Sequence, residues 1–310
     1  MRNDGKWGFH DTSAAARIES RSLYTHGISS VDFDQDGFGD VLVYGYGGVM
    51  LFLNLGDGTF DDVTASAGLS HAPWTTAAAW IDIDRDQQLD LCLGSYVNWN
   101  FATHQTCKAQ NGESDVCSPN AFDGMQNSVF LSNGEGSFSR EDSLMRSPLP
   151  TKTLGMLTGE FDAGDGVGMY VANDLVANLL FTRREGKFVE HGLTSGVALD
   201  DAGVANGSMG ITMLDFNLDR KFDLFVTNFE HELMALYVNA DGDYFNHVSR
   251  QVGLNRSDMR VVAFGVVAGD FDGDADEATV ALCEDAGATL LRGSIAAAAA
   301  VAKGSWLLIV

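Results

Sequence analysis

The sequence predicts an all-β fold built from repeated four-stranded antiparallel units. Glycine is abundant, with 35 residues, and proline is scarce, with 4. Many short apolar runs are separated by Asn-Gly or Asp-Gly pairs, which is typical of β-chains with many tight turns. An Asp-rich stretch also recurs five times along the chain. The 310 residues are enough to bury a large core within one domain.

The repeat has the period of a propeller blade. The Asp-rich stretches begin at Asp32, Asp82, Glu160, Asp215 and Asp270. Their start-to-start spacings are therefore 50, 78, 55 and 55 residues. A period near 50 residues corresponds to about four strands per unit. The long interval contains Cys107 and Cys117, and we interpret it as one repeat that carries an insertion.

Each unit also ends in a Gly-rich turn between two apolar runs, as in residues 51–60 and 236–245. The unit therefore contains a strand, an Asp-rich loop, a strand, a short turn, a strand, a Gly-rich hairpin and a strand. One such meander cannot bury both faces, so neighbouring units must stack. The sequence predicts a β-propeller over residues 1–292, in which five repeats are counted. Residues 5–11 match 56–63, and we expect this first strand to complete the last blade.

The Asp-rich loops are predicted to hold Ca²⁺ as several structural sites. Alternating carboxylates in a tight loop form a dense group of hard oxygen ligands, of which calcium takes roughly six to eight. Magnesium demands stricter octahedral geometry. Clustered carboxylates repel one another without a cation, so we infer that the ion contributes folding free energy. The predicted ligands are Asp32, Asp34, Asp36, Asp40, Asp82, Asp84, Asp86, Asp90, Asp215, Asn217, Asp219, Asp223, Asp270, Asp272, Asp274, Glu160 and Asp162.

Two of the five loops are incomplete. The Asp270 loop has Ala278 at its ninth position, where the better loops have Asp. The Glu160 loop has Gly164 and Gly168 at ligand positions. We expect weaker binding at the first of these loops and an empty, degenerate site at the second.

Two alternatives use similar loops. An EF-hand shares the first five positions but needs a bidentate Glu at position 12 and flanking helices. Position 12 is apolar here, and the flanking runs resemble strands; the residues are Val43, Leu93, Val226 and Ala281. The other alternative is that Asp and Gly only form turns. Five loops in register, with strands on both sides, favour metal binding over that interpretation.

The charge balance excludes several partners. The net charge is −24, from 19 basic and 43 acidic residues. Nucleic acids and anionic membranes need a basic surface, so neither is an expected partner.

The cysteines form no Cys-x-x-Cys pair, which argues against a zinc or redox centre. Cys107 and Cys117 can form a local disulfide, whereas Cys92 and Cys283 lie in apolar runs and are expected to be buried thiols.

The loops and the Phe-Asp-x-Asp-Gly pattern at 33–37 resemble the FG-GAP/VCBS repeats of the integrin α-subunit propeller. Other stretches resemble bacterial relatives of cartilage acidic protein, which usually carry a C-terminal ASPIC/UnbV domain. These stretches are residues 61–64, 67–69, 117–119, 169–174, 208–210 and 223–228. The resemblance covers about Trp7 to Arg292 and implies a calcium-binding propeller, secreted or on the cell surface. Residues 303–310 resemble the first strand of an ASPIC/UnbV domain, so we interpret 293–310 as a truncated start of that domain.

We expect a calcium-binding extracellular interaction or adhesion module without catalytic activity. No Gly-x-Ser-x-Gly, P-loop or His-Glu-x-x-His motif is present. The long segment 98–126 suits recognition of a protein or glycan, because propellers present variable loops on one face. The alternative is a propeller-scaffold enzyme or a lectin that acts on polysaccharide.

The chain ends bear on location. Residues 1–6 form a polar turn and not a charged, then apolar, leader. The apolar run 295–302 is too short to span a bilayer, so no membrane insertion is expected. The chain stops inside the apolar run 306–310, and we expect it to be a piece of a longer protein. The expected location is secreted, at the cell surface or periplasmic.

Overall fold

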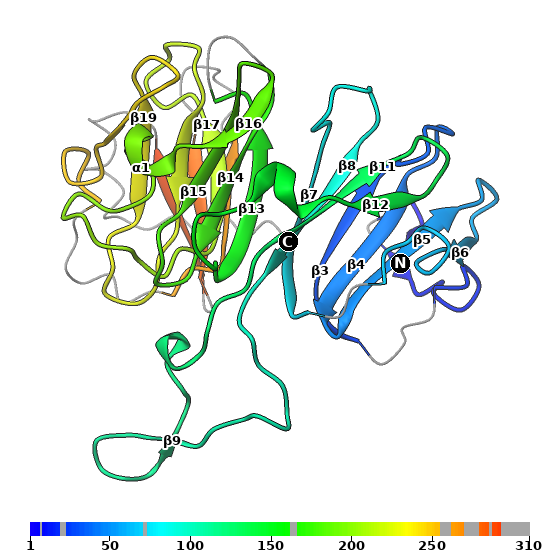
Figure 1. Ribbon diagram of the computed structural model, residues 1–310, viewed down its shortest axis with the longest axis horizontal. Coiled ribbons are helices and arrows are strands. Elements are labelled where there is room, and N and C mark those ends of the chain that lie inside the picture. The colour runs from blue at the N-terminus through cyan, green and yellow to red at the C-terminus, as the bar shows by residue number, and fades with distance from the viewer. Residues whose placement is uncertain are drawn as a thin grey trace.

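The computed structural model describes residues 1–6, 8–18, 23–70, 73–161, 166–254, 262–269, 279–284 and 287–292. Over these residues the chain forms five larger antiparallel sheets, arranged side by side (Figure 1), and two small two-stranded sheets. Four of the sheets have four strands, and the last described one has three. The predicted all-β fold with four-stranded antiparallel units is confirmed.

The strands follow the predicted meander. The first sheet contains β3 (Tyr24–Val31), β4 (Asp40–Tyr46), β5 (Gly48–Asn54) and β6 (Phe60–Asp62). The second contains β7 (Thr75–Ile81), β8 (Asp90–Ser95), β11 (Ser128–Ser132) and β12 (Phe138–Arg140). The third contains β13 (Thr153–Gly159), β14 (Gly168–Asn173), β15 (Leu179–Arg184) and β16 (Lys187–Glu190). The fourth contains β17 (Ile211–Leu214), β18 (Asp223–Val226), β19 (Ala235–Asn239) and β20 (Phe245–His247). The fifth contains β21 (Gly265–Gly269), β22 (Thr279–Glu284) and β23 (Gly287–Arg292).

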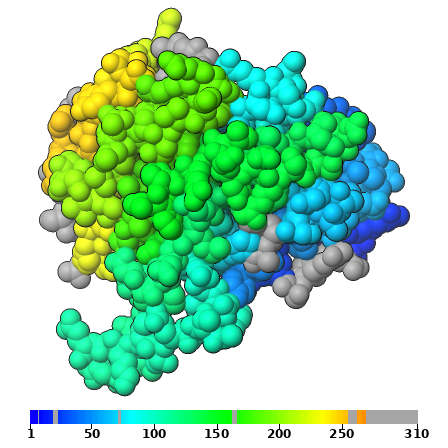
Figure 2. Space-filling view, in the orientation of Figure 1, coloured from blue at the N-terminus to red at the C-terminus, as the bar shows by residue number. Residues whose placement is uncertain are grey.

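The predicted insertion lies between β8 and β11 and projects from the body of the molecule (Figures 1 and 2). It carries a small hairpin, β9 (Cys107–Lys108) and β10 (Ser114–Asp115), and a short helix, η1 (Pro119–Ala121). A disulfide joins Cys107 to Cys117 and closes this hairpin. The local disulfide that the sequence allows is therefore confirmed.

The remaining elements are short. They are β1 (Arg2–Asn3), β2 (Phe9–His10), η2 (Asp142–Met145) and α1 (Gly192–Ser195). Within the described ranges, no helix has the length and apolar character that crossing a bilayer would require.

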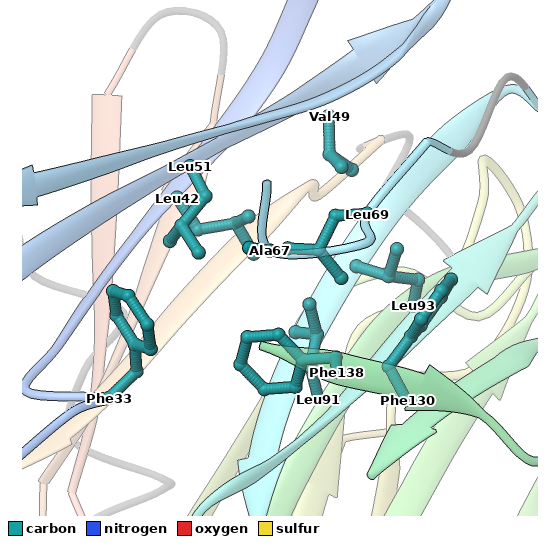
Figure 3. Packing of buried hydrophobic residues seen from close by; sticks show 10 residues of the cluster. All are labelled: Phe33, Leu42, Val49, Leu51, Ala67, Leu69, Leu91, Leu93, Phe130 and Phe138. Atoms are coloured by element: carbon teal, nitrogen blue, oxygen red, sulfur yellow. The ribbon is translucent and has the colours of Figure 1, made fainter. Parts of the chain in front are cut away.

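The hydrophobic core lies between consecutive sheets. The first cluster joins Leu42 and Leu51 of the first sheet to Leu91 and Leu93 of the second (Figure 3). Three further clusters join the second sheet to the third, the third to the fourth and the fourth to the fifth. Because central strands are covered on both faces, β8 and β14 are buried at every residue. The sheets thus stack face to face, as propeller blades do.

The aromatic residue at the second position of the Asp-rich loops takes part in this stacking. Phe33 and Phe161 are buried in the clusters, and Phe216 is partly buried. The equivalent Phe271 lies outside the described residues. Cys92 is also buried, as predicted, and burial raises the pKa of its thiol to about 12.

The first strand of each sheet faces the centre of the arc. Strand β3 contacts β7, β7 contacts β13, β13 contacts β17, and β17 contacts β21. This chain of contacts puts the first strands on the inside, where a propeller has its axis. The closure of the ring and the number of blades stay predictions.

The N-terminal segment packs on the first sheet as a blade connection does. The carbonyl of Ala16 accepts a hydrogen bond from the Phe60 amide at 2.9 Å, and the carbonyl of Ala67 accepts the equivalent bond from Phe138 at 2.9 Å. Strand β2 itself pairs with β1. That the first strand completes the last blade therefore stays a prediction.

The stacking predicts a large cost for truncating a core side chain. Leu91 is completely buried between the first two sheets, so Leu91→Ala should lower the free energy of unfolding by about 2–5 kcal/mol. Leu149→Ala is the control, because Leu149 is 72% exposed and its truncation should cost little. Denaturant unfolding of the full chain measures both. Equal costs would contradict the packing described above.

Candidate metal centre

Each Asp-rich loop connects the first and second strands of its sheet, as predicted. In the three loops at Asp32, Asp82 and Asp215, the residue before the loop pairs with the ninth loop residue: Val31 with Asp40, Ile81 with Asp90, and Leu214 with Asp223. The three loops therefore have the same length and close the same hairpin register.

The loops at Asp32, Asp82 and Asp215 also share one backbone path. Their fourth and sixth residues all have positive φ. These residues are Gln35 (61°), Gly37 (92°), Arg85 (69°), Gln87 (72°), Leu218 (59°) and Arg220 (67°). Residues other than Gly rarely adopt this region. The same unusual path in three different sequences indicates that it is fixed by the shared Asp and Asn side chains.

The first carboxylate of each loop is held inside the turn. Asp32 accepts hydrogen bonds from the amides of Asp36 at 3.1 Å and Gly37 at 3.0 Å. Asp215 accepts the corresponding two bonds at 3.0 and 2.8 Å. Asp82 accepts from the fourth and sixth amides of its own loop at 2.7 and 3.0 Å. These bonds leave lone pairs on the carboxylates, which a cation could share.

The ninth carboxylate has a different role, which the sequence analysis missed. Asp40 is fully buried. One of its oxygens accepts from the Phe33 amide at 3.1 Å, and the other accepts from the Asn54 amide at 2.8 Å. Because Asn54 ends β5, this side chain ties the loop to the third strand of the sheet. Asp90 and Asp223 make the same pair of bonds, at 2.7 and 2.8 Å and at 2.8 and 2.8 Å.

The predicted ligands converge in the first two loops. Carboxylate oxygens of Asp32, Asp34 and Asp40 lie within 4.8 Å of one another. The same holds for a second group, which is Asp82, Asp84 and Asp86. Two oxygens bound to one calcium at about 2.3–2.6 Å can be at most roughly 5 Å apart. Each group therefore fits around a single ion. Asp36 and Asp90 lie outside these two groups.

Burial and repulsion act on these carboxylates. Burial, followed by the charges of neighbouring aspartates, raises the pKa of Asp34 and of Asp84. Burial also raises the pKa of Asp90 and of Asp223 to about 6, against the hydrogen bonds from backbone amides. The charged form of these four carboxylates is therefore disfavoured in the folded chain. A bound cation would relieve that penalty.

The loop at Asp215 has a weaker donor set. Asn217 replaces one carboxylate, and its side-chain amide donates to Asp219 at 3.2 Å. The ammonium of Lys221 lies 3.6 Å from the same carboxylate oxygen, Asp219 Oδ2. Burial raises the pKa of Asp219, but the Lys221 amide, Asn217 and the Lys221 charge outweigh it and lower the pKa overall. This loop thus carries less negative charge than the other two.

The first two loops touch each other. The side-chain amide of Gln35 donates to the carbonyl of Gln87 at 2.8 Å and to the side chain of Gln88 at 3.0 Å. Neighbouring sheets are therefore joined at their loop ends as well as through the core.

The degenerate loop lacks its ninth carboxylate. Glu160 is exposed at the end of β13, and Asp162 lies outside the described residues. The ninth position is Gly168, where a Cβ would lie 2.6 Å from the carbonyl oxygen of Phe181. Neighbouring backbone therefore excludes a carboxylate there. Asp270, Asp272 and Asp274 also lie outside the described residues, so their metal role stays a prediction.

The EF-hand alternative is wrong for the loops described. Position 12 is Val43 in β4, Leu93 in β8 and Val226 in β18. Strands, not helices, flank each loop, and no bidentate carboxylate can come from these apolar side chains.

The comparisons with known proteins agree with the repeat. Residues 32–93 match the profile of the family described as FG-GAP-like repeat. This region contains the first two Asp-rich loops and covers well under half of the chain. Of the segments that resemble the cartilage acidic protein relatives, it includes 61–64 and 67–69 but none of the later ones, and it does not reach residues 293–310. No match was found among the curated proteins.

One similar solved structure is that of an Agrocybe aegerita lectin, described for its specific recognition of non-reducing terminal N-acetylglucosamine. The identity is 14% and the TM-score is 0.45. The alignment covers 84% of this chain and 63% of that chain, so this chain spans less than two thirds of the lectin. At this level, the likeness carries no argument about function.

The two kinds of carboxylate predict opposite effects in metal-free buffer. Asp90→Asn should lower the free energy of unfolding by about 1–3 kcal/mol, because an amide offers only one acceptor oxygen to two buried amides. Asp84→Asn should not lower it, because the exposed Asp84 side chain is repelled by its neighbours. Denaturant unfolding in the presence of chelator measures both. A loss of similar size in both variants would contradict the distinct role of the ninth position.

Proposed function

We propose that this chain is a calcium-stabilised extracellular interaction module without catalytic activity of its own. The observation that carries the proposal is the repeated loop. Three loops share one backbone path, and in two of them three carboxylates converge within 4.8 Å. Hard oxygen donors at this density suit calcium, and zinc or copper would favour nitrogen or sulfur ligands. On this proposal the ions stabilise the sheet ends and take no part in a reaction.

A disulfide supports the extracellular part of the proposal. The Cys107–Cys117 disulfide is the kind of bond that persists in secreted or periplasmic proteins. The acidic net charge of −24 fits an environment with millimolar calcium, because extracellular modules bind calcium at about 10⁻⁴–10⁻³ M.

Calcium should raise the thermal stability of the chain. An ion that binds only the folded state at about ten times its dissociation constant adds about 1.4 kcal/mol, so the two loops with converging carboxylates together add about 2.8 kcal/mol. This corresponds to a rise of about 5 °C or more in the melting temperature. The measurement is thermal unfolding in chelator, in millimolar calcium and in millimolar magnesium. An unchanged melting temperature in calcium would remove the proposal.

The ligands themselves are tested by charge removal. The double variant Asp34→Asn/Asp84→Asn should lose most of the calcium-induced shift, because each substitution removes one converging carboxylate. Asp115→Asn is the matched control, because Asp115 is exposed in the insertion and its loss should leave the shift intact. Calorimetric titration with calcium then gives the number of sites that each variant retains.

The third loop should gain affinity by two local changes. Asn217→Asp with Lys221→Gln adds a carboxylate and removes the neighbouring ammonium, so the calcium affinity of this loop should increase by about tenfold. Lys187→Gln, an exposed change on β16, is the control for lost positive charge. The readout is the calcium titration, and an unchanged affinity would show that this loop is not a calcium site.

A further inference from the structure

A large cavity lies at the end of the sheets opposite to the Asp-rich loops. Its volume is about 860 Å³, which is within the range of small-molecule sites. Thr76 and Leu154 line it near the starts of β7 and β13, and Tyr96 and Asp174 line it just after β8 and β14. The Asp-rich loops follow the other ends of these first strands. The cavity and the metal loops are therefore separate sites.

The cavity is centred on the axis of the arc. One lining residue comes from near the start of each of the five first strands. These residues are His26, Thr76, Leu154, Met209 and Phe264. The other side of the cavity is formed by the base of the insertion, including Trp99, His104 and Phe122. Sheets and insertion thus enclose one space that no single repeat forms.

Three aromatic rings, those of Trp74, Tyr96 and Trp99, form inclined walls of this cavity, and we call them the aromatic walls. The Trp74 and Tyr96 rings are 5.3 Å apart at 81°, and the Trp74 and Trp99 rings are 5.6 Å apart at 58°. Tyr46 also packs against both indoles, so these rings form one packed aromatic surface. A ring face that this surface exposes to the cavity attracts a cation electrostatically.

The two indoles are held in place before any ligand binds. The Trp74 indole N–H donates to His26 Nε2 at 2.7 Å, and the Trp99 indole N–H donates to His104 Nδ1 at 3.1 Å. Each accepting imidazole nitrogen is therefore unprotonated. These bonds occupy the indole N–H groups, so the indoles offer apolar ring atoms to a ligand, and their fixed orientation lowers the entropic cost of binding.

A buried carboxylate completes the site. Asp174 is 8% exposed and lines the cavity. Its Oδ2 accepts a hydrogen bond from the Tyr96 hydroxyl at 2.5 Å. Burial raises the pKa of Tyr96, and the bond to Asp174 adds to this, so the phenol keeps its proton and acts as the donor. Among the described residues, Oδ1 of Asp174 accepts no hydrogen bond, which leaves one oxygen for a ligand.

The charges around this carboxylate do not cancel. The ammonium of Lys152 is near Asp174 and donates to the carbonyl of Pro119 at 2.8 Å. A second carboxylate, Glu232, also acts on this region; it accepts from the Gly207 and Phe229 amides at 2.8 and 3.0 Å. Two carboxylates and one ammonium leave a negative balance at this wall of the cavity.

These features select one ligand chemistry. A sugar has a hydroxyl on most carbons, and this mostly aromatic and aliphatic lining offers few partners for them; the Thr76 hydroxyl, for example, already donates to the carbonyl of Thr153. An anionic lipid would meet the Asp174 carboxylate. We propose that the cavity binds a small organic ammonium ion, with an apolar body and one positively charged nitrogen, which uses Asp174 as counter-ion and packs against the aromatic walls. The inference rests on the proposed interaction function and not on the calcium sites.

The test uses an isosteric pair of probes on the full chain in millimolar calcium. Choline and 3,3-dimethylbutan-1-ol differ in a positively charged nitrogen against a neutral carbon, and benzyltrimethylammonium adds a larger apolar body. Calorimetry and tryptophan fluorescence should show that choline binds about tenfold or more tightly than its neutral isostere. Benzyltrimethylammonium should bind at least as tightly as choline.

Two variants separate the role of the Asp174 charge from that of the aromatic walls. Asp174→Asn should weaken binding of benzyltrimethylammonium by about tenfold or more, while its amide oxygen still accepts from Tyr96. Asp123→Asn removes an exposed carboxylate of the insertion outside the cavity and should have no effect. Trp99→Leu tests the aromatic walls independently and should weaken binding of the cation more than that of the neutral isostere.

The outcomes that overturn the proposal are specific. Equal affinity for the two isosteres, no binding of any ammonium probe, or equal effects of Asp174→Asn and Asp123→Asn would each do so. Binding of N-acetylglucosamine without ammonium binding would assign the cavity to a sugar instead. If Asp174→Asn fails to fold, the isostere pair and Trp99→Leu still decide the question. A calcium-independent melting temperature with intact ammonium binding would remove only the proposed metal role.

Discussion

A buried aspartate at the ninth position of the Asp32, Asp82 and Asp215 loops holds together parts of a sheet that lie far apart in the repeat. In the first sheet, Asp40 accepts one amide from the loop and one from the end of the third strand. The three loops that have this pair of bonds also share one backbone path, whereas the hairpin register does not require it, because Gly159 pairs with Gly168 in the loop that lacks the aspartate. A charged group that is buried and doubly bonded in this way is costly to replace.

The stacking of sheets sets the remaining geometry. Clusters between consecutive sheets fix the order and spacing of the units. This order places all the described loops at one end of the first strands and the axial cavity at the other. The Asp-rich loops and the cavity can therefore change separately, since no residue of the aromatic walls belongs to an Asp-rich loop.

The sequence was informative wherever the determinants are local. The alternating aspartates, the Gly-rich turns and the fixed spacing from Asp32 to Asp40 predicted the strands and the loops. The second partner of Asp40 is the Asn54 amide, and a backbone group leaves no trace in the sequence. The smaller negative charge of the Asp215 loop required the position of Lys221 in space. The axial cavity was not predictable, because Trp74 and Asp174 come from different repeats. Segment 98–126 was singled out in the sequence as suited to recognition of a protein or glycan; Trp99, His104 and Phe122 of this segment line the cavity, and its role in recognition stays a prediction.

The placement of each Asp-rich loop inside a single hairpin bears on how such a chain can evolve. All nine loop positions belong to one repeat, so a copy of the repeat carries the whole loop with it. Loss of a loop carboxylate is equally local. Gly168 stands where neighbouring repeats have aspartate, with the Phe181 backbone packed against it, yet β13 to β16 still form a complete sheet. Individual repeats can thus be duplicated or can lose their loop carboxylates while the array persists.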